Sequence, residues 1–388
     1  MDDIFENTEN AFALKSDSEL ERAYFLFRMI ANEPLVRIGT AVTNFAIKAH
    51  LPVEGLIRST VFDHFCGGVN EEDCLPVVEK MYSKGVCSVL DYSVEAKEEE
   101  AQFDTALEIT LKILEFVKER NSIPFAVFKP TGFGRLALYE KLGQSIPFTP
   151  DEQAEWERVV QRFEKVCQKT QQMQVRLLID AEESWMQDAA DDLVERLMKK
   201  YNTERPYIYS TLQMYRWDRL DYLKEQHRKA EEGGYFLGYK LVRGAYMEKE
   251  NARAEAMGYP TPICSSKEKT DTNFDNAVRY IMDNLKIISL FAGTHNEKST
   301  YLILDHMKEK QLLNNDENIW FGQLYGMSDH ISYNLSAAGY NVAKYLPFGP
   351  VRDVMPYLIR RAEENTSVVG QTNRELVLIE RERKRRKI

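Results

Sequence analysis

The chain has 388 residues, 44% of them hydrophobic, and a formal net charge of −10. This length can bury a large core in one large domain or two smaller ones, and the acidic balance argues against nucleic acid as a partner. No apolar run approaches the roughly 20 residues that a bilayer-spanning helix needs.

The N-terminus and the cysteines indicate the compartment. The first residues are acidic and show neither a signal peptide nor an Arg-rich transit segment. Five scattered cysteines without a CxxC pair are typical of reduced thiols. We therefore expect a cytoplasmic protein. The six histidines include no HExxH motif and no pair four residues apart, so no metal site is expected.

Residues 1–84 are predicted to form an N-terminal helical arm. Helices are expected over 19–30 and 34–50, and a third ends near Phe65. Apolar side chains recur at helical spacing in the first of these, for example Leu20, Tyr24 and Phe27. This apolar face predicts that the arm packs on the domain that follows.

From residue 85 to 370, short apolar runs alternate with amphipathic segments such as 100–120 and 151–171. The predicted strands are 86–92, 125–129, 175–180, 207–214, 236–242, 287–292, 319–325 and 342–348. Near-continuous apolar strands between helices indicate a parallel sheet with covered faces. Eight strands over about 260 residues predict an α/β fold of the (β/α)8 barrel class, with a doubly wound open sheet as the alternative.

Polar side chains follow nearly every predicted strand. They are Asp91 and Glu95, Lys129, Asp180, Gln213, Lys240 and Arg243, Thr294 with His295 and Asn296, Gln323, and Tyr345. In a (β/α)8 barrel the active site lies at the C-terminal ends of the strands. A purely structural rim does not need this set of groups, so the sequence predicts an active site there.

A last barrel helix is expected over about 353–366, because Pro350 and Pro356 both fit a helix start. One face of that helix holds Tyr357, Arg360, Arg361 and Glu364. Two adjacent guanidinium groups suit a small carboxylate, with each charge-assisted bond contributing roughly 1.5–3 kcal/mol. An isolated pair of arginines would instead indicate a solvated, salt-bridged surface helix.

The chain resembles the proline dehydrogenase family over about residues 60–370. The resemblance rests on Tyr357-x-x-Arg360-Arg361-x-x-Glu364-Asn365, on Leu241-Val-Arg-Gly-Ala-Tyr246 and on Ile179-Asp-Ala-Glu-Glu183. Phe65-Cys-Gly-Gly68 and the last strand are most similar to the monofunctional, mitochondrial-type branch. The resemblance implies an FAD-dependent (β/α)8 barrel that oxidises L-proline to Δ1-pyrroline-5-carboxylate and passes electrons to a quinone-type acceptor.

The resemblance also implies the substrate site, with the last helix over the barrel mouth. Arg360, Arg361 and Lys129 would hold the proline carboxylate, and Glu95 would pair with Arg360 as a gate when substrate is absent. The ring would lie against Tyr345, Tyr357 and Leu324, and Asp180 would support this pocket through Tyr345. Catalytic roles are therefore expected for Lys129, Asp180, Tyr345, Tyr357, Arg360 and Arg361.

The flavin site implied by the resemblance comprises Gln213, Lys240, Arg243, Tyr246, Thr294, His295, Asn296, Gln323 and Glu364. One departure matters, because many family members have Arg at the position of Lys240 and Lys at that of Arg243. Which of these two cations addresses the flavin N5 region is left open by the sequence.

Three alternative functions stay open from the residues. Hydroxyproline oxidation is one, although in the family a tyrosine at the position of Tyr345 crowds the ring carbon that would carry the hydroxyl. A lysine-dependent aldolase barrel with a Schiff base on Lys129 is the second, and a non-catalytic carboxylate-binding protein is the third.

The C-terminal tail, residues 371–388, is strongly basic near its end. Residues 381–387 hold six cations and one acid. This pattern predicts a solvated helix end, with peripheral attachment to anionic lipid at the inner face of a membrane as the alternative.

Overall fold

The computed structural model describes residues 4–31, 55, 58–93, 98–367 and 371–388 of the chain, and excludes the side chains of 59–60 and 361–372. The predicted helix over 34–50 and the proposed gate residue Glu95 lie outside the described residues. Two compact units are present, Met1–Glu95 with Gln323–Ile388, and Ala96–Gly322. The predicted division into arm, barrel and tail stays a prediction.

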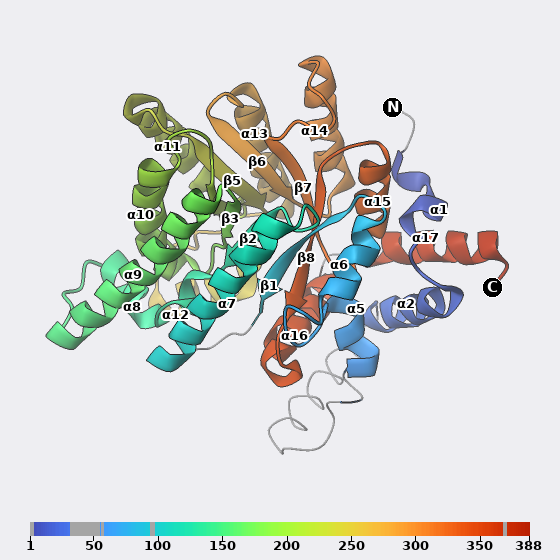
Figure 1. Cartoon of the computed structure of the whole chain (residues 1–388), viewed down its shortest axis with the longest axis horizontal. Helices are drawn as coiled ribbons and strands as arrows, with labels where there is room; N and C mark the ends of the chain where they lie inside the picture. Colours follow the sequence, from blue (N-terminus) through green and yellow to red (C-terminus); the bar gives the residue numbers. More distant parts are fainter. Residues whose placement is uncertain (1–3, 32–54, 56–57, 94–97, 368–370) are drawn as a thin grey trace. The chain divides into compact units, whose positions relative to one another are not determined.

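Eight strands form a closed barrel in chain order (Figure 1). They are β1 (Cys87–Tyr92), β2 (Phe125–Phe128), β3 (Arg176–Ile179), β4 (Ile208–Gln213), β5 (Leu237–Val242), β6 (Ile288–Gly293), β7 (Ile319–Leu324) and β8 (Val342–Phe348). The strand pairs are parallel, and β1 pairs with β8 so that Val89 lies opposite Tyr345. The (β/α)8 barrel is thereby confirmed, and the open doubly wound sheet is excluded.

Close packing inside the barrel requires glycine at specific strand positions. The Phe125 ring makes edge-on contacts with the rings of Tyr209, Phe291 and Trp320 at centroid distances of 5.2–5.5 Å. A Cβ at Gly322 would lie 2.2 Å from the Phe291 ring. Any larger residue at that position would displace an aromatic ring from a fully packed interior.

The helices of the unit Ala96–Gly322 follow the strands as predicted. They are α7 (Glu100–Glu119), α8 (Leu136–Gly143), α9 (Pro150–Met173), α10 (Ser184–Tyr201), α11 (Arg219–Gly233), α12 (Met247–Met257), α13 (Lys267–Asp283) and α14 (Glu297–Glu309). Helix α9 starts where a capping box forms, because Thr149 Oγ1 accepts from Glu152 N and Glu152 accepts from Thr149 N.

The other unit contains β1, β8 and the remaining helices. These are α1 (Thr8–Ala11), α2 (Asp17–Ile30), α5 (Asp63–Phe65), α6 (Leu75–Tyr82), α15 (Asp329–Ala337), α16 (Val351–Ser367) and α17 (Gln371–Arg386). Helix α16 differs from the prediction, because it begins at Val351 and holds Pro356 in its interior. Pro350 alone therefore marks its start, and Pro356 removes one backbone donor from the helix.

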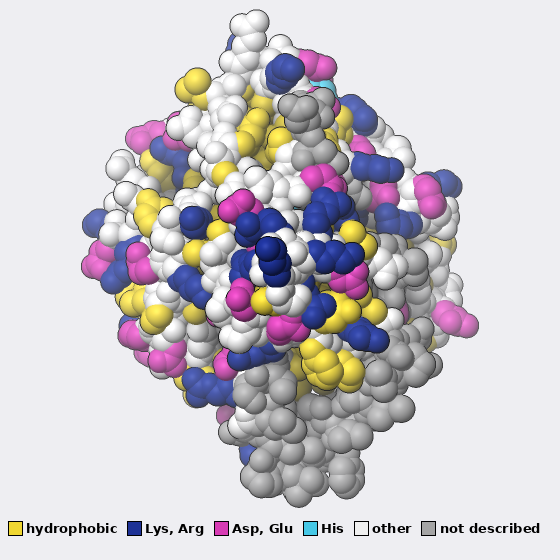
Figure 2. Space-filling model, turned by 90° about the vertical axis from the view of Figure 1, so that its right-hand side faces the viewer, with side chains coloured by type: hydrophobic (Ala, Val, Ile, Leu, Met, Phe, Trp, Pro, Cys, Tyr) yellow, Lys and Arg dark blue, Asp and Glu magenta, His cyan; other side chains and the backbone are white. Residues whose placement is uncertain are grey.

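The basic tail forms helix α17, and its end is solvated in part, with Arg381, Lys384, Arg385 and Lys387 exposed and Glu382 buried. Leu378 and Ile379 of α17 are buried in one cluster with residues of α1 and α2, including Leu20 and Phe27. Figure 2 shows the face on which α17 ends, with Asp and Glu side chains among the gathered Lys and Arg side chains. Arg374 and Arg381 pair with Glu6, and further ion pairs join Arg383 to Glu21 and Arg386 to Asp17. Apolar burial and paired charge together explain the packing.

In the described part of the chain, no helix is both long enough and apolar enough to cross a bilayer.

Candidate active site

The C-terminal ends of β2, β3 and β5 bring two lysines to one carboxylate. Asp180 directly follows β3, and its backbone N–H donates to Phe128 O at 3.0 Å, which extends the sheet pairing. Lys240 Nζ makes a direct ion pair with Asp180 Oδ1, and Lys129 Nζ lies 3.8 Å from Oδ2. The three side chains are only 7–15% exposed. Charges interact strongly in such a largely buried place, so Asp180 fixes the positions of both ammonium groups.

A second carboxylate holds the turn that follows Lys129. Glu182 is buried and accepts from Thr131 N at 2.8 Å and from Thr131 Oγ1 at 2.6 Å. Burial raises the pKa of Glu182 to about 7, although the hydrogen bonds from Thr131 oppose the shift. Tyr139 OH donates to Pro130 O at 2.7 Å. The turn carrying Lys129 is thus fixed from two sides.

Arg243, at the end of β5, is anchored to the start of the next helices. Its guanidinium donates to Asp271 Oδ1 at 2.6 Å, to Thr294 Oγ1 at 2.9 Å and to Ser299 Oγ at 3.0 Å. Burial opposes the shift, but hydrogen bonds from Lys267 and Arg243 lower the pKa of Asp271. A side chain with three such partners is a fixed cation, whereas Lys240 points into the cluster around Asp180.

The other predicted flavin residues of this unit lie at the same strand ends. Tyr246 is half-buried and is the residue immediately before α12, with the Lys249 ammonium 5.7 Å from its ring centre. Half-buried His295 follows Thr294 after β6, and Asn296 caps α14 by accepting from Ser299 N at 3.1 Å. The Asn296 side chain is therefore used to start a helix.

Gln213 offers the most direct test of whether these residues fit a flavin. It is 3% exposed, and its Nε2 donates to Ala181 O at 3.2 Å. Its Oε1 is buried and has no hydrogen-bond partner among the described residues. A buried amide oxygen left unpaired costs about 1–3 kcal/mol, so a ligand that donates an N–H group at this point fits the residues present.

The remaining predicted residues belong to the other compact unit. Leu324, at the end of β7, packs against a buried apolar cluster that includes Tyr357 and Met355 of α16. Tyr345 on β8 is 8% exposed, and its backbone oxygen accepts from Tyr325 N at 2.8 Å. Leu324 and Tyr357 therefore belong to the same apolar packing region, and their role as a wall of the substrate pocket stays a prediction.

Four further residues of that unit complete the predicted set. Gln323 is buried, and its Oε1 accepts from Ser332 Oγ at 2.9 Å. Arg360 is half-buried on α16. Arg361 and Glu364 lie in the same helix, but their side chains lie outside the described residues. The clamp that combines Arg360 and Arg361 with Lys129 draws on both units and stays a prediction, as does contact between Asp180 and Tyr345.

Sequence reasoning missed the residues that hold the rim in place. Glu182 stands inside the quoted Ile179–Glu183 segment, but its partner Thr131 lies on another strand end, 51 positions away. Asp271 and Ser299 lie on α13 and α14, and neither belongs to a motif that the sequence shows. Only the parallel pairing of neighbouring strands, which places their carboxyl ends together, could have suggested such contacts.

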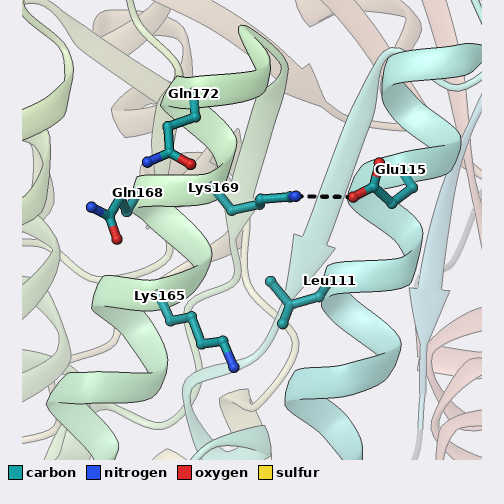
Figure 3. A pocket seen from close by; sticks show the side chains of 6 residues that line it. All are labelled: Leu111, Glu115, Lys165, Gln168, Lys169 and Gln172. Carbon is teal, nitrogen blue, oxygen red and sulfur yellow. Dashed lines mark ion pairs between the residues drawn. The ribbon is translucent and has the colours of Figure 1, made fainter.

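A hollow on the outside of the barrel is not part of this site. It lies between α7 and α9, has a volume of about 280 Å³, and is lined by Leu111, Glu115, Lys165, Gln168, Lys169 and Gln172 (Figure 3). Lys169 crosses it to form an ion pair of 3.1 Å with Glu115. None of the predicted site residues lines it.

The fold is a closed (β/α)8 barrel with charged side chains gathered at the C-terminal ends of its strands, where enzymes of this fold class have their active sites. Comparison with known proteins assigns the family. Residues 74–374 match the family model described as proline dehydrogenase, and the chain belongs to this family.

The chain is similar to curated relatives over most of its length. The chain is 35% identical to the carbapenem antibiotics biosynthesis protein CarD of Pectobacterium carotovorum, over 90% of this chain and 91% of that protein. It is 31% identical to the mitochondrial proline dehydrogenase 2 of Arabidopsis thaliana, over 97% of this chain and 89% of that protein.

The crystal structure of proline utilization A from Bdellovibrio bacteriovorus, inactivated by N-propargylglycine, is similar with a TM-score of 0.72 and 19% identity. The likeness covers 93% of this chain and 38% of that one, and it shows the shared barrel fold.

Proposed function

We propose that the protein oxidises L-proline to Δ1-pyrroline-5-carboxylate with bound FAD as the hydride acceptor, and that a quinone-type molecule then takes the electrons. Membership of the proline dehydrogenase family over residues 74–374 carries this proposal. The two lysines gathered at the rim support an anionic substrate, because charge-assisted hydrogen bonds from ammonium groups suit a carboxylate.

We assign binding of the substrate carboxylate to three cationic side chains. Arg360 and Arg361 would each offer a planar fork to the proline carboxylate, and Lys129 would add a third cation. In the absence of substrate, Glu95 would form an ion pair with Arg360 and so act as a gate. The clamp leaves the carboxylate in one orientation, which presents one face of the ring to the cofactor.

The walls of the pocket give the preference for proline. Leu324 and Tyr357 already share one apolar cluster, which supports a common wall. Tyr345 would close the ring site on the side where a hydroxyl of hydroxyproline would have to fit. The relative kcat/KM for the two substrates tests this preference.

The FAD site is assigned to Gln213, Lys240, Arg243, Tyr246, Thr294, His295, Asn296, Gln323 and Glu364. When bound, the flavin supplies an acceptor for the hydride of a C–H bond beside nitrogen, which no side chain can accept. Gln213 would accept a hydrogen bond through its unpaired Oε1. Lys240 would serve as the cation nearest the reacting end, because it lies in the Asp180 cluster together with Lys129, which is assigned to the substrate carboxylate. Arg243 is instead held by Asp271, Thr294 and Ser299.

Only the neutral amine of proline can lose hydride productively, so activity should rise with pH as the substrate nitrogen loses its proton. We assign no dedicated base, because the sequence shows no residue suited to that role.

Membrane contact is the alternative role of the basic tail. The basic end of α17 would then bring the protein to an anionic lipid surface that holds the quinone-type acceptor. Several of its arginines are, however, already paired with Glu6, Glu21 or Asp17, which reduces the charge they can offer.

The test is spectroscopic. Purified protein should be yellow, and anaerobic proline should bleach the flavin absorbance while pyrroline-5-carboxylate accumulates. A colourless protein that forms a borohydride-trapped adduct on Lys129 would indicate the aldolase alternative. Saturable proline binding without any turnover would indicate a carboxylate-binding protein.

A further inference from the structure

Lys344 of β8 ties the turn after β7 to the strand that carries Tyr345. Its side chain is completely buried, and its Nζ donates to Met327 O at 2.6 Å and to Leu324 O at 3.4 Å. The same ammonium forms an ion pair of 2.8 Å with Asp329 at the start of α15. One buried cation therefore holds the backbone of residues 324–327, with the Asp329 carboxylate as its counter-charge.

The opposite side of this turn lies against α5. His64 Nε2–H donates to Gly326 O at 3.1 Å. Burial lowers the pKa of His64 to about 3, so the ring is neutral and keeps this proton at Nε2. Gly326 has a positive φ of 79°, and a Cβ there would lie 2.4 Å from His64 O. The turn is thus held closely between β8 and α5.

Both ends of the chain reach the same turn. Lys15, between α1 and α2, forms an ion pair of 3.0 Å with Asp329. Glu375 of α17 accepts a hydrogen bond from Ser328 N, at a residue whose φ of +50° is left-handed. We name Lys15 and Glu375 the terminal clasp. Figure 1 shows α1 and α17 beside α15, as these contacts require.

A cavity of about 90 Å³ adjoins the clasp, so that water can reach the charged groups if a side chain of the clasp is removed. Lys15, His64, Tyr325 and Asp329 are among the residues that line it. Removal of the Lys15 ammonium would leave Asp329 with one cationic partner beside a space that water can enter. The turn would then be less constrained, while Lys344 would still hold part of it.

We propose that the terminal clasp positions Leu324 for substrate binding, and that Lys15, Glu375 and Lys344 are positioning residues that never touch proline. This inference rests on the proposed function, in which Leu324 forms a wall of the ring site. The link is direct, because the Leu324 backbone is held by Lys344 while its side chain packs in the cluster of Tyr357 and Met327. The N-terminal arm and the C-terminal helix thereby act on substrate affinity.

The experiment compares Lys15→Met with Lys169→Met by steady-state kinetics on the full-length flavoenzyme. Lys169 lies on α9, forms an exposed ion pair of 3.1 Å with Glu115 and does not line the cavity beside the clasp, so it is the same change at an unrelated ion pair. We expect Lys15→Met to raise KM for proline about 5- to 20-fold with kcat within about twofold. Lys15→Arg should restore most of the affinity, and Lys169→Met should match the wild type.

Different failures have different meanings. A wild-type protein that never reduces flavin with proline refutes the proposed function. An active wild type, together with an unchanged KM in Lys15→Met, overturns the clasp alone. A purely structural role would lower the yield of active enzyme or its kcat without moving KM. If Lys15→Met does not fold, Glu375→Ala removes instead the hydrogen bond that α17 accepts from Ser328 N. An unchanged KM in that variant equally overturns the inference.

Discussion

Glu182 should make the stability of this protein depend on pH in a direction opposite to that of an ordinary surface carboxylate. Its pKa is raised from 4.5 to about 7 by burial, with Glu183 adding to the shift and Thr131 and Lys129 opposing it. An acid with a higher pKa in the folded state binds its proton more tightly there. Its favourable contribution is therefore fully present below pH 4.5 and is lost as pH rises through 7.

The size of this effect follows from the shift. Each unit of pKa corresponds to 1.36 kcal/mol, so the folded state should lose about 2–3 kcal/mol at this site between pH 5 and pH 8. Glu182→Gln removes the titration but keeps one oxygen that can accept from Thr131. The stability difference between wild type and variant should therefore move by that amount in favour of the variant over this range.

Urea unfolding of both proteins at half-unit steps of pH, with flavin saturating throughout, measures this difference. Thr131→Val provides a second check, because it removes the 2.6 Å hydroxyl donor that lowers the pKa of Glu182. In that variant the loss of stability should move to higher pH. Parallel curves for wild type and Glu182→Gln, within about 0.5 kcal/mol, would refute the reasoning.

Three further predictions follow from the site and the fold. Arg360→Met should raise KM for proline about 10- to 100-fold with a smaller change in kcat, because it removes charge-assisted bonds of roughly 1.5–3 kcal/mol, and an unchanged KM would exclude a carboxylate contact. Asp180→Asn should destabilise the fold by about 3–5 kcal/mol, since it removes the buried carboxylate that pairs with both Lys129 and Lys240, and thermal unfolding measures this. Deletion of residues 380–388 should lower the melting temperature by several degrees through loss of pairs to Glu21 and Asp17, while binding to anionic vesicles stays unchanged. Vesicle binding that disappears with the deletion would restore the membrane role of the tail.

The strands of the barrel could be predicted almost residue by residue. The expected run 342–348 is β8, and the run 319–325 differs from β7 by one residue. Strand positions follow from continuous apolar runs, which a buried parallel strand requires. The meeting of Lys129, Asp180 and Lys240 follows from the same register, because the carboxyl ends of parallel strands share one rim.

Features that depend on distant partners could not be predicted. Pro350 and Pro356 both fit a helix start by local rules, yet only Pro350 precedes α16. The charges of residues 381–387 predicted a solvated helix end, and Arg381, Lys384 and Arg385 are exposed there. No local pattern showed that Leu378 and Ile379, just before this segment, pack on residues more than 340 positions away in the chain. The raised pKa of Glu182 likewise arises from burial, which no local motif records.

The pairing of β1 with β8 has a consequence for biosynthesis. Strand β1 (residues 87–92) pairs with β8 (residues 342–348), so the barrel cannot close during translation until nearly the whole chain has emerged from the ribosome. During translation the first strand keeps an open edge that can pair with another nascent chain. Chains that stop before residue 342 should therefore aggregate, and expression should improve when translation near the 3′ end is fast.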